Sequence, residues 1–195
     1  MLPFQLRPYR PADCASLAAL FYDTVHTVNA KDYTNAQLDA WADGNVDPDA
    51  WNASFLSHTT YVAVLPHENK DEAGDGDGDD KHHGDDEDSS YIGREENCHG
   101  DDMEERIIGF GDMDASGYLD RLYVHKDYQG QGVATAICDR LEEEIQTDAF
   151  STHASITARP FFEKRRYTVV KAQQVVRKGV SIRNYVMRKR IEYSV

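Results

Sequence analysis

The fold is decided by residues 117–136, which run from Gly117 to Ala136 and read GYLDRLYVHKDYQGQGVATA. The first half mixes aromatic and aliphatic side chains as a strand does, and the last residues begin a helical pattern. Between them lie Gly130 and Gly132. Glycines let backbone N–H groups approach a ligand closely, and a helix start adds unpaired donors with a partial positive charge. The stretch therefore predicts a strand, a glycine-rich turn and a helix that form an anion site suited to a pyrophosphate.

Two better-known phosphate sites do not fit this stretch. A P-loop requires a lysine after its last glycine, and here Val133 follows Gly132. A dinucleotide fingerprint requires Gly or Ala where Thr135 stands, together with an acid about twenty residues further on. Asp148 falls near that distance, but too little chain follows for the remaining β-α units.

Upstream, the pattern predicts a strand at residues 4–10 and a helix at 12–29 with Asp13 as its N-cap. Two further short helices are expected at 35–41 and 48–56. The longer helix is indicated by apolar residues three and four positions apart, namely Leu17, Leu20, Phe21, Val25 and Val28.

The remaining elements give the order β-α-α-β-β-β-α-β-α-β-β, a mixed α/β layer fold. Strands at 59–65 and 106–113 are expected to form an antiparallel pair. After them we expect a strand at 117–127, a helix at 132–147, a strand at 150–156, a short helix at 160–166, and a closing hairpin of 167–176 with 180–191 around Lys178 and Gly179.

Acidic residues are concentrated in residues 67–105. The chain has 195 residues and a net charge of -14, with 35 acidic and 21 basic residues. Seventeen of the acidic and three of the basic residues lie in this one segment. Such a sequence buries too little apolar surface to offset its ordering entropy, so we expect a disordered insertion in place of a hairpin turn. The whole chain, 1–195, is then a single domain interrupted at about 67–105.

The composition indicates in which cellular compartment the protein resides and whether it contains disulfides or a zinc site. Hydrophobic residues make up 40% of the chain, which excludes a wholly disordered protein, and no run approaches the roughly 18 apolar residues of a membrane span. The N-terminal residues show no secretory signal. The three cysteines, Cys14, Cys98 and Cys138, form no CxxC pair, which argues against a disulfide framework and a zinc site. We expect a cytoplasmic protein without a metal.

At this point the sequence resembles the GNAT superfamily of N-acetyltransferases. Their phosphate motif, Gln/Arg-x-x-Gly-x-Gly/Ala, corresponds to Gln129-Gly130-Gln131-Gly132-Val133-Ala134. It is preceded by Leu122-Tyr123-Val124 and followed by an amphipathic helical pattern. A downstream stretch from Ser155 to Tyr167 is similar to the family's Asn-x-x-Ala-x-x-Phe-Tyr-x-x-x-Gly-Phe segment. The expected element order also matches, and the resemblance covers nearly everything except the acidic insertion.

The resemblance implies acetyl-CoA as co-substrate and assigns the residues that would bind it. Backbone groups of Leu122 and Val124 would hold the pantetheine arm, and backbone amides from Gln129 to Ala134 would bind the pyrophosphate. The full expected set is Leu122, Tyr123, Val124, Gln129, Gly130, Gln131, Gly132, Val133, Ala134, Thr135, Ser155 and Phe162.

The resemblance breaks at three positions. Phe162 stands where the family has the tyrosine that protonates the departing thiolate, Ser155 replaces an asparagine, and Arg166 replaces a glycine. A thiolate with a pKa near 8.5 can leave unaided, so the missing tyrosine weakens a mechanism without removing the activity. Tyr167 is expected to pack in the core.

Asp120 and Tyr118 are the candidate catalytic residues. Strand alternation places Tyr118, Asp120 and Leu122 on one face, and Leu119, Arg121 and Tyr123 on the other. Asp120 is the nearest carboxylate to the family's base position, and Tyr118 could relay a proton through water. The alternative is a solvated aspartate beside Arg121 and a packing tyrosine.

His26 and Asn29, one helical turn apart, are candidates for the acceptor pocket, which the family builds from its first two helices; a surface pair is the alternative.

The leading hypothesis is an acetyl-CoA-dependent N-acetyltransferase that transfers acetyl to a small-molecule or peptide amine by direct attack in a ternary complex. The alternatives are a cofactor-binding module without turnover and a binder of basic proteins through the acidic tract. We expect no nucleic-acid or membrane partner, and either a monomer or a homodimer.

Overall fold

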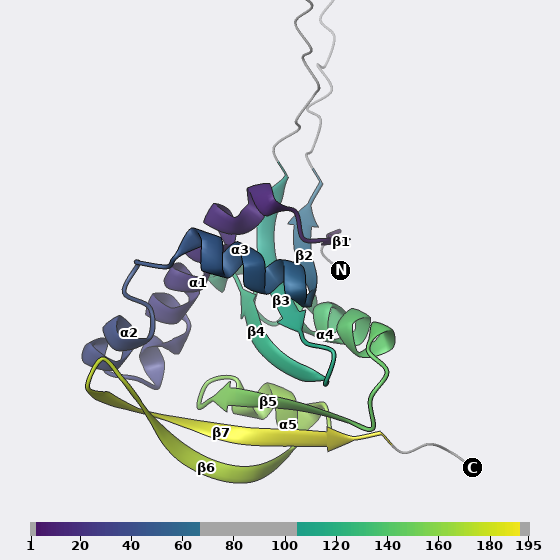
Figure 1. Cartoon of the computed structure of the whole chain (residues 1–195). Coiled ribbons are helices and arrows are strands. Elements are labelled where there is room, and N and C mark those ends of the chain that lie inside the picture. Colours follow the sequence, from purple (N-terminus) through teal and green to yellow (C-terminus); the bar gives the residue numbers. More distant parts are fainter. Residues whose placement is uncertain (1–2, 67–104, 192–195) are drawn as a thin grey trace, which may run out of the picture. The chain divides into compact units, whose positions relative to one another are not determined.

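The computed structural model describes residues 3–66 and 105–191, so that nearly all of the expected insertion at 67–105 lies outside the described residues. Within them, seven strands form one mixed sheet with the order β1-β2-β3-β4-β5-β7-β6 (Figure 1). All neighbours are antiparallel except β4 and β5. The strands are β1 (Gln5–Pro8), β2 (Thr59–Leu65), β3 (Arg106–Met113), β4 (Tyr118–Val124), β5 (Ala149–Ser155), β6 (Thr168–Arg177) and β7 (Val180–Arg190).

Three α-helices separate β1 from β2, as the expected ranges 12–29, 35–41 and 48–56 require, although the expected order of elements shows only two there. Thr34 and Asp47 each cap a separate helix: Thr34 Oγ1 accepts from the backbone N–H of Gln37, and Asp47 Oδ1 accepts from that of Asp49. Asp13 is the N-cap residue of the first helix as expected, but its side chain makes no capping hydrogen bond, because its carboxylate binds Arg7 at 2.8 and 2.9 Å. The α-helices are α1 (Cys14–Thr27), α2 (Asn35–Trp41), α3 (Pro48–Ser57), α4 (Val133–Glu144) and α5 (Arg159–Lys164).

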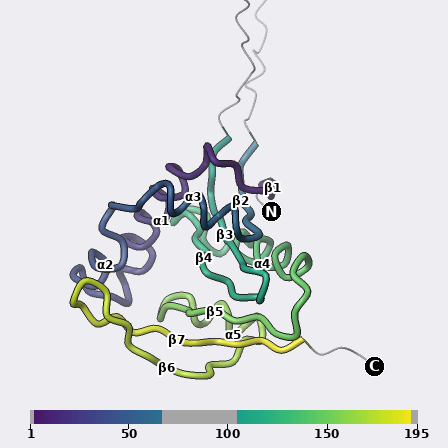
Figure 2. Tube along the Cα trace, in the orientation of Figure 1, coloured from purple at the N-terminus to yellow at the C-terminus, as the bar shows by residue number. Residues whose placement is uncertain are grey.

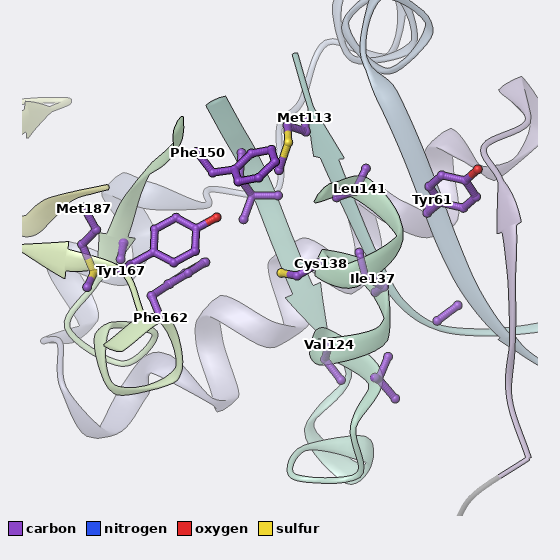
Figure 3. Close-up of a cluster of buried hydrophobic side chains, with 14 of the residues drawn as sticks. Tyr61, Met113, Val124, Ile137, Cys138, Leu141, Phe150, Phe162, Tyr167 and Met187 are labelled. Atoms are coloured by element: carbon purple, nitrogen blue, oxygen red, sulfur yellow. The ribbon is translucent and has the colours of Figure 1, made fainter. Parts of the chain in front are cut away.

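The helices cover both faces of the sheet, and each face has its own apolar core. Alternation along β2 divides its side chains, with Tyr61 and Ala63 in one core and Val62 and Val64 in the other. The first core contains the buried residues of α4 and α5; Figure 3 shows α4 residues such as Ile137 lying over the strands. The second core contains those of α1, α2 and α3.

The sheet parts between β4 and β5, at the centre of the strand order. These two parallel strands pair only at Tyr118 with Ser151 and at Leu119 with Thr152, beyond which they diverge (Figures 1 and 2). The antiparallel pairs on either side of the parting are longer. The expected antiparallel pairing of 59–65 with 106–113 and the closing hairpin around Lys178 and Gly179 are both confirmed.

The expected alternation of side chains along β4 is wrong at Asp120, because a β-bulge interrupts the strand there. Arg121 pairs with Asp112 and Leu119 pairs with Met113, so that Asp120 falls in the register shift between them. As a result Leu119 packs in the α4 core, whereas Arg121 lies over the ring of Phe55 in α3. Leu119 therefore does not share a face with Arg121, because the bulge reverses the order of faces at this point.

Candidate functional site

A cavity of about 400 Å³ opens where β4 and β5 part. One end lies at the turn between β4 and α4, which contributes Gln129, Gly130 and Gly132. Asp120, in the bulge near the start of β4, lines the part away from this turn, and Asn29 from the segment after α1 also lines the cavity. The cavity therefore connects the glycine turn to the only carboxylate in its lining.

The glycine turn is shaped for close approach of a ligand to the backbone. Gly130 and Gly132 have φ angles of +72° and +88°, in the left-handed region that side chains other than glycine rarely adopt. No atom of the described residues lies within 4 Å of the place where a Cβ would stand on either glycine. Gly132 is also the N-cap of the 12-residue helix α4. The turn thus offers open space in front of unpaired backbone donors, and it fits the pyrophosphate of acetyl-CoA.

Two side chains fix the edge of β4 next to this turn. Gln129 Nε2 donates to the carbonyl oxygen of Val124 at 2.5 Å, and Thr24 Oγ1 donates to the same oxygen at 3.3 Å. Gln129 therefore ties the turn to the strand before it, and Thr24 ties α1 to the same carbonyl.

Nearly all residues expected to bind the cofactor line the cavity. Gln131 does not: its side chain donates to the backbone carbonyl of Asp127 at 2.9 Å and braces the turn from outside. The expected residues that do line the cavity are Leu122, Tyr123, Val124, Gln129, Gly130, Gly132, Val133, Ala134, Thr135, Ser155 and Phe162.

Three residues in and around α5 depart from the family pattern, and the structure shows what each of their side chains or backbones does. Phe162 is 3% exposed, lines the cavity and packs edge-on against Tyr167, which is itself buried as expected. Ser155 Oγ accepts from the backbone N–H of Ala158 at 2.9 Å. Arg166 has a φ of +67°, so the turn keeps the conformation that glycine favours and accommodates a side chain there.

Of the two residues expected to line the acceptor pocket, only one lines the cavity. Asn29 is buried and lines the cavity. His26 does not line it; a ring nitrogen of His26 lies 2.8 Å from the carbonyl oxygen of Ala42, and its ring packs against Tyr22. The two residues separate because α1 ends at Thr27 and Asn29 begins a 3-10 turn, so helical spacing no longer applies.

Asp120 lines the cavity with its side chain 41% exposed, and Tyr118 lies beside the cavity without lining it. The ring of Tyr118 packs edge-on against His153, which does line the cavity, with 5.3 Å between ring centres. Burial raises the pKa of Asp120 above its usual value and raises that of Tyr118 to about 12. Tyr118 therefore remains protonated at neutral pH.

A second carboxylate, Asp112, lies behind Asp120. Ligand atoms of His58, Asp112 and Asp120 all lie within 4.8 Å of one another. The grouping does not fit a metal ion, because the guanidinium of Arg121 already contacts both oxygens of Asp112, at 2.8 and 2.9 Å. It is an ion-pair network in which the cation is an arginine.

Several cavity residues were not expected from sequence. Some of them lie within or beside the two stretches that resemble the family, although no role was assigned to them, and the others come from elements that only the fold brings to the parted strands. They are Thr24, Val28, Trp41, Tyr128, Thr152, His153, Ala154, Thr157, Ala158 and Phe161.

A mixed sheet that parts between two parallel strands, with a glycine turn opening a helix at the parting, is the architecture expected of a GNAT acetyltransferase. The family model described as an acetyltransferase (GNAT) domain matches residues 80–189, and the chain belongs to this family. It is an acyltransferase.

Known relatives agree with this assignment along nearly the whole chain. The chain is 28% identical over 187 residues to the uncharacterized N-acetyltransferase YafP of Escherichia coli, covering 94% of each. It is 27% identical to a GCN5-related N-acetyltransferase from Rhodopseudomonas palustris, with a TM-score of 0.72 and coverage of 96% and 95%. The PaiA N-acetyltransferase of Thermoplasma acidophilum, solved in complex with coenzyme A, shares the fold with a TM-score of 0.63 at 11% identity, covering 97% and 99%.

In the part of the chain that the structure describes, no helix has the length and apolar character needed to cross a membrane.

Proposed function

We propose that this chain is an acetyl-CoA-dependent N-acetyltransferase that acts on a primary amine by direct attack in a ternary complex. The observation that carries the proposal is the single cavity that joins the Gly130–Gly132 turn to Asp120. The turn would hold the pyrophosphate, and the edge of β4 from Leu122 to Val124 would hold the pantetheine arm. The coenzyme A bound to a structural relative supports the same cofactor for this chain.

Asp120 is the proposed general base. Its raised pKa brings its proton affinity closer to that of an acceptor amine, and the cavity gives an amine access to it. When bound, acetyl-CoA supplies the activated acetyl group. The amine nitrogen gives a proton to Asp120 and forms the new C–N bond, the C–S bond breaks, and the thiolate leaves. Phe162 offers no proton at the family's tyrosine position, so the thiolate takes its proton from water.

The acceptor would be a small-molecule or peptide amine that enters beside Asn29 and Trp41, which line the cavity at the α1 and α2 end.

The test has two stages. Calorimetric titration of the whole protein with acetyl-CoA is expected to show one site, and thiol release is then measured against amines, amino acids, aminoglycosides and basic peptides. Absence of acetyl-CoA binding would overturn the proposal. Binding without turnover on the whole panel would instead favour a cofactor-binding module.

A further inference from the structure

Asp112, at the end of β3, carries a fully buried carboxylate, with 0% of the residue exposed. Nδ1 of His58 lies 2.6 Å from its Oδ2. Arg121 donates from Nε to Oδ1 at 2.8 Å and from Nη2 to Oδ2 at 2.9 Å. A buried charge is tolerated when it is paired and hydrogen-bonded, and Asp112 meets both conditions through two neighbours.

The guanidinium of Arg121 is held on Asp112 from several sides. It lies 4.2 Å from the ring centre of Phe55 and 5.2 Å from that of Trp51, and Nη2 also donates to Ser54 Oγ. All three of these neighbours belong to α3. Arginine stacked on aromatic rings and bound bidentately to a carboxylate has little freedom to reach another partner.

Asp120 is next to Arg121 in sequence, yet it makes only one long contact with the guanidinium, whereas Asp112 makes two short ones. The nearest approach is 3.5 Å, between Arg121 Nη2 and Asp120 Oδ2, which is longer than a good hydrogen bond. The β-bulge turns Asp120 into the cavity, while Arg121 points toward α3. Asp120 is therefore a carboxylate whose adjacent arginine is occupied by another carboxylate.

The charges around Asp120 come from four elements. Burial and the charge of Asp112 on β3 raise the pKa of Asp120, whereas Arg121 on β4, His58 at the end of α3 and Arg177 on β6 lower it. The net effect is a raised pKa of Asp120. A direct pair with an arginine lowers the pKa of a carboxylate by roughly 1 to 3 units, which would oppose these raising contributions.

We propose that Asp112 is a positioning residue of the acetyl transfer: it holds Arg121 away from Asp120 and so keeps Asp120 available as the base. This inference rests on the proposed function. Asp112 does not touch the reacting atoms, and its effect passes through Arg121.

His58, which is partly exposed to solvent, also affects the pKa of Asp120. Its side chain is 19% exposed, and its hydrogen bond to Asp112 raises its pKa. Protonated His58 places a second positive charge near Asp120. Because a raised histidine pKa means that this charge is lost only as pH rises through the raised value, Asp120 becomes more basic above it.

The test uses two variants with opposite expected shifts. In Asp112→Asn, Arg121 loses its charged partner and turns to Asp120, so the acid limb of the kcat/KM profile moves to lower pH by about 1 unit or more. In His58→Asn, the side-chain amide keeps a donor near the position of Nδ1 but carries no charge. The acid limb then moves to higher pH, by less than the Asp112→Asn shift.

The same shifts are read without turnover from carboxyl carbon resonances in an NMR titration, with Asp120→Asn used to assign the Asp120 signal. Unmoved limbs and an unmoved Asp120 titration in both variants, or shifts of the same sign, would overturn the inference. Should Asp112→Asn fail to fold, the sign of the His58→Asn shift decides. A chain that acetylates no amine defeats the proposed function, while the NMR titration still decides the inference.

Discussion

The two ends of the cavity are built by different means. The cofactor end is mostly backbone: a turn with two left-handed glycines and the start of α4, all within one continuous stretch of chain. The acceptor end consists of side chains from α1, α2, β4 and β5, with Asp120 set by a network that reaches β3 and α3. A backbone site depends on local conformation, whereas a side-chain site depends on the whole fold. Substitutions at the two ends should therefore affect different measured quantities.

The largest effect is expected at the acceptor end, from Asp120→Asn. Loss of a general base lowers rates by roughly 10²- to 10⁴-fold, and we expect kcat to fall within that range. The Kd for acetyl-CoA should remain that of the unmodified chain, because Asp120 lies near the start of β4 and the glycine turn follows the end of that strand. Steady-state kinetics and calorimetry measure the two quantities separately.

Asp139→Asn is the matched control, since Asp139 lies on α4 outside the cavity and 55% of its side chain is exposed. A Kd that rises together with the fall in kcat would show that the two ends are not separable.

The next largest effect is expected at the cofactor end, from Gly132→Ala. The new methyl group would stand in the open space before the turn, and we expect acetyl-CoA to bind roughly 10- to 100-fold more weakly, equivalent to the loss of one charge-assisted hydrogen bond. Calorimetry checks the affinity and thermal unfolding checks the stability.

Gly179→Ala provides the comparison for strain. Gly179 has a φ of +79° and equally open space around it, but it lies in the β6–β7 turn. Both variants should lose similar stability, about 1 kcal/mol, and only Gly132→Ala should lose affinity. Equal affinities for acetyl-CoA in the two variants would show that the turn at Gly132 does not bind the cofactor.

Tyr33→Phe tests the wall behind the acceptor end. The Tyr33 hydroxyl donates to the carbonyl oxygen of Arg183 at 2.8 Å and accepts from the N–H of Ile156 at 2.8 Å. Its removal leaves two backbone groups without this partner, and we expect unfolding free energy to fall by about 2 kcal/mol. Denaturant unfolding measures this change.

Tyr9→Phe, which removes a hydroxyl bonded to the single side-chain oxygen of Asn52, is expected to cost about half as much. Equal losses in the two variants would mean that the bridge between β5 and β7 adds nothing beyond one hydrogen bond.

The smallest effect is expected from replacing residues 67–104 with Asn-Gly. Leu65 and Arg106 are paired in the β2–β3 ladder, so a short turn can close the hairpin between them. A shorter connection reduces the entropic cost of bringing β2 and β3 together. We therefore expect the free energy of unfolding to rise by at most about 2 kcal/mol, with the affinity for acetyl-CoA unchanged. Thermal unfolding and calorimetry check both; a loss of affinity would give the segment a part in the cofactor end.

The same contrast explains what sequence could predict. The glycine turn, the amphipathic α4 and the hairpin around Lys178 and Gly179 follow from local chemistry and were predicted with nearly correct bounds. The positions expected to bind the cofactor came from the resemblance to the family's motifs, and Gln131 alone of that set does not line the cavity.

Asp120 and Asn29 were predicted and line the cavity, but the geometry of the acceptor end was not predicted, because it arises from tertiary contacts. The bulge at Asp120 depends on how β4 registers against β3, and no residue in β4 marks it. Asp13 occupies the expected N-cap position of α1, but its carboxylate binds Arg7 of β1 and makes no capping hydrogen bond. His26 and Asn29 separate because the helix ends between them.

The strand order has a consequence for the nascent chain on the ribosome. β7, the last described strand to be synthesised, lies between β5 and β6, and it is the neighbour with which β5 makes seven pairs, against two with β4. Until β7 emerges, the wall of the cavity formed by β5 has almost no partner, and the Tyr33 hydroxyl lacks its acceptor on Arg183. Domains fold from the N-terminus as they are made, so the glycine turn and α4 can form during translation. We expect the acceptor end to form only after β7 has emerged from the ribosome.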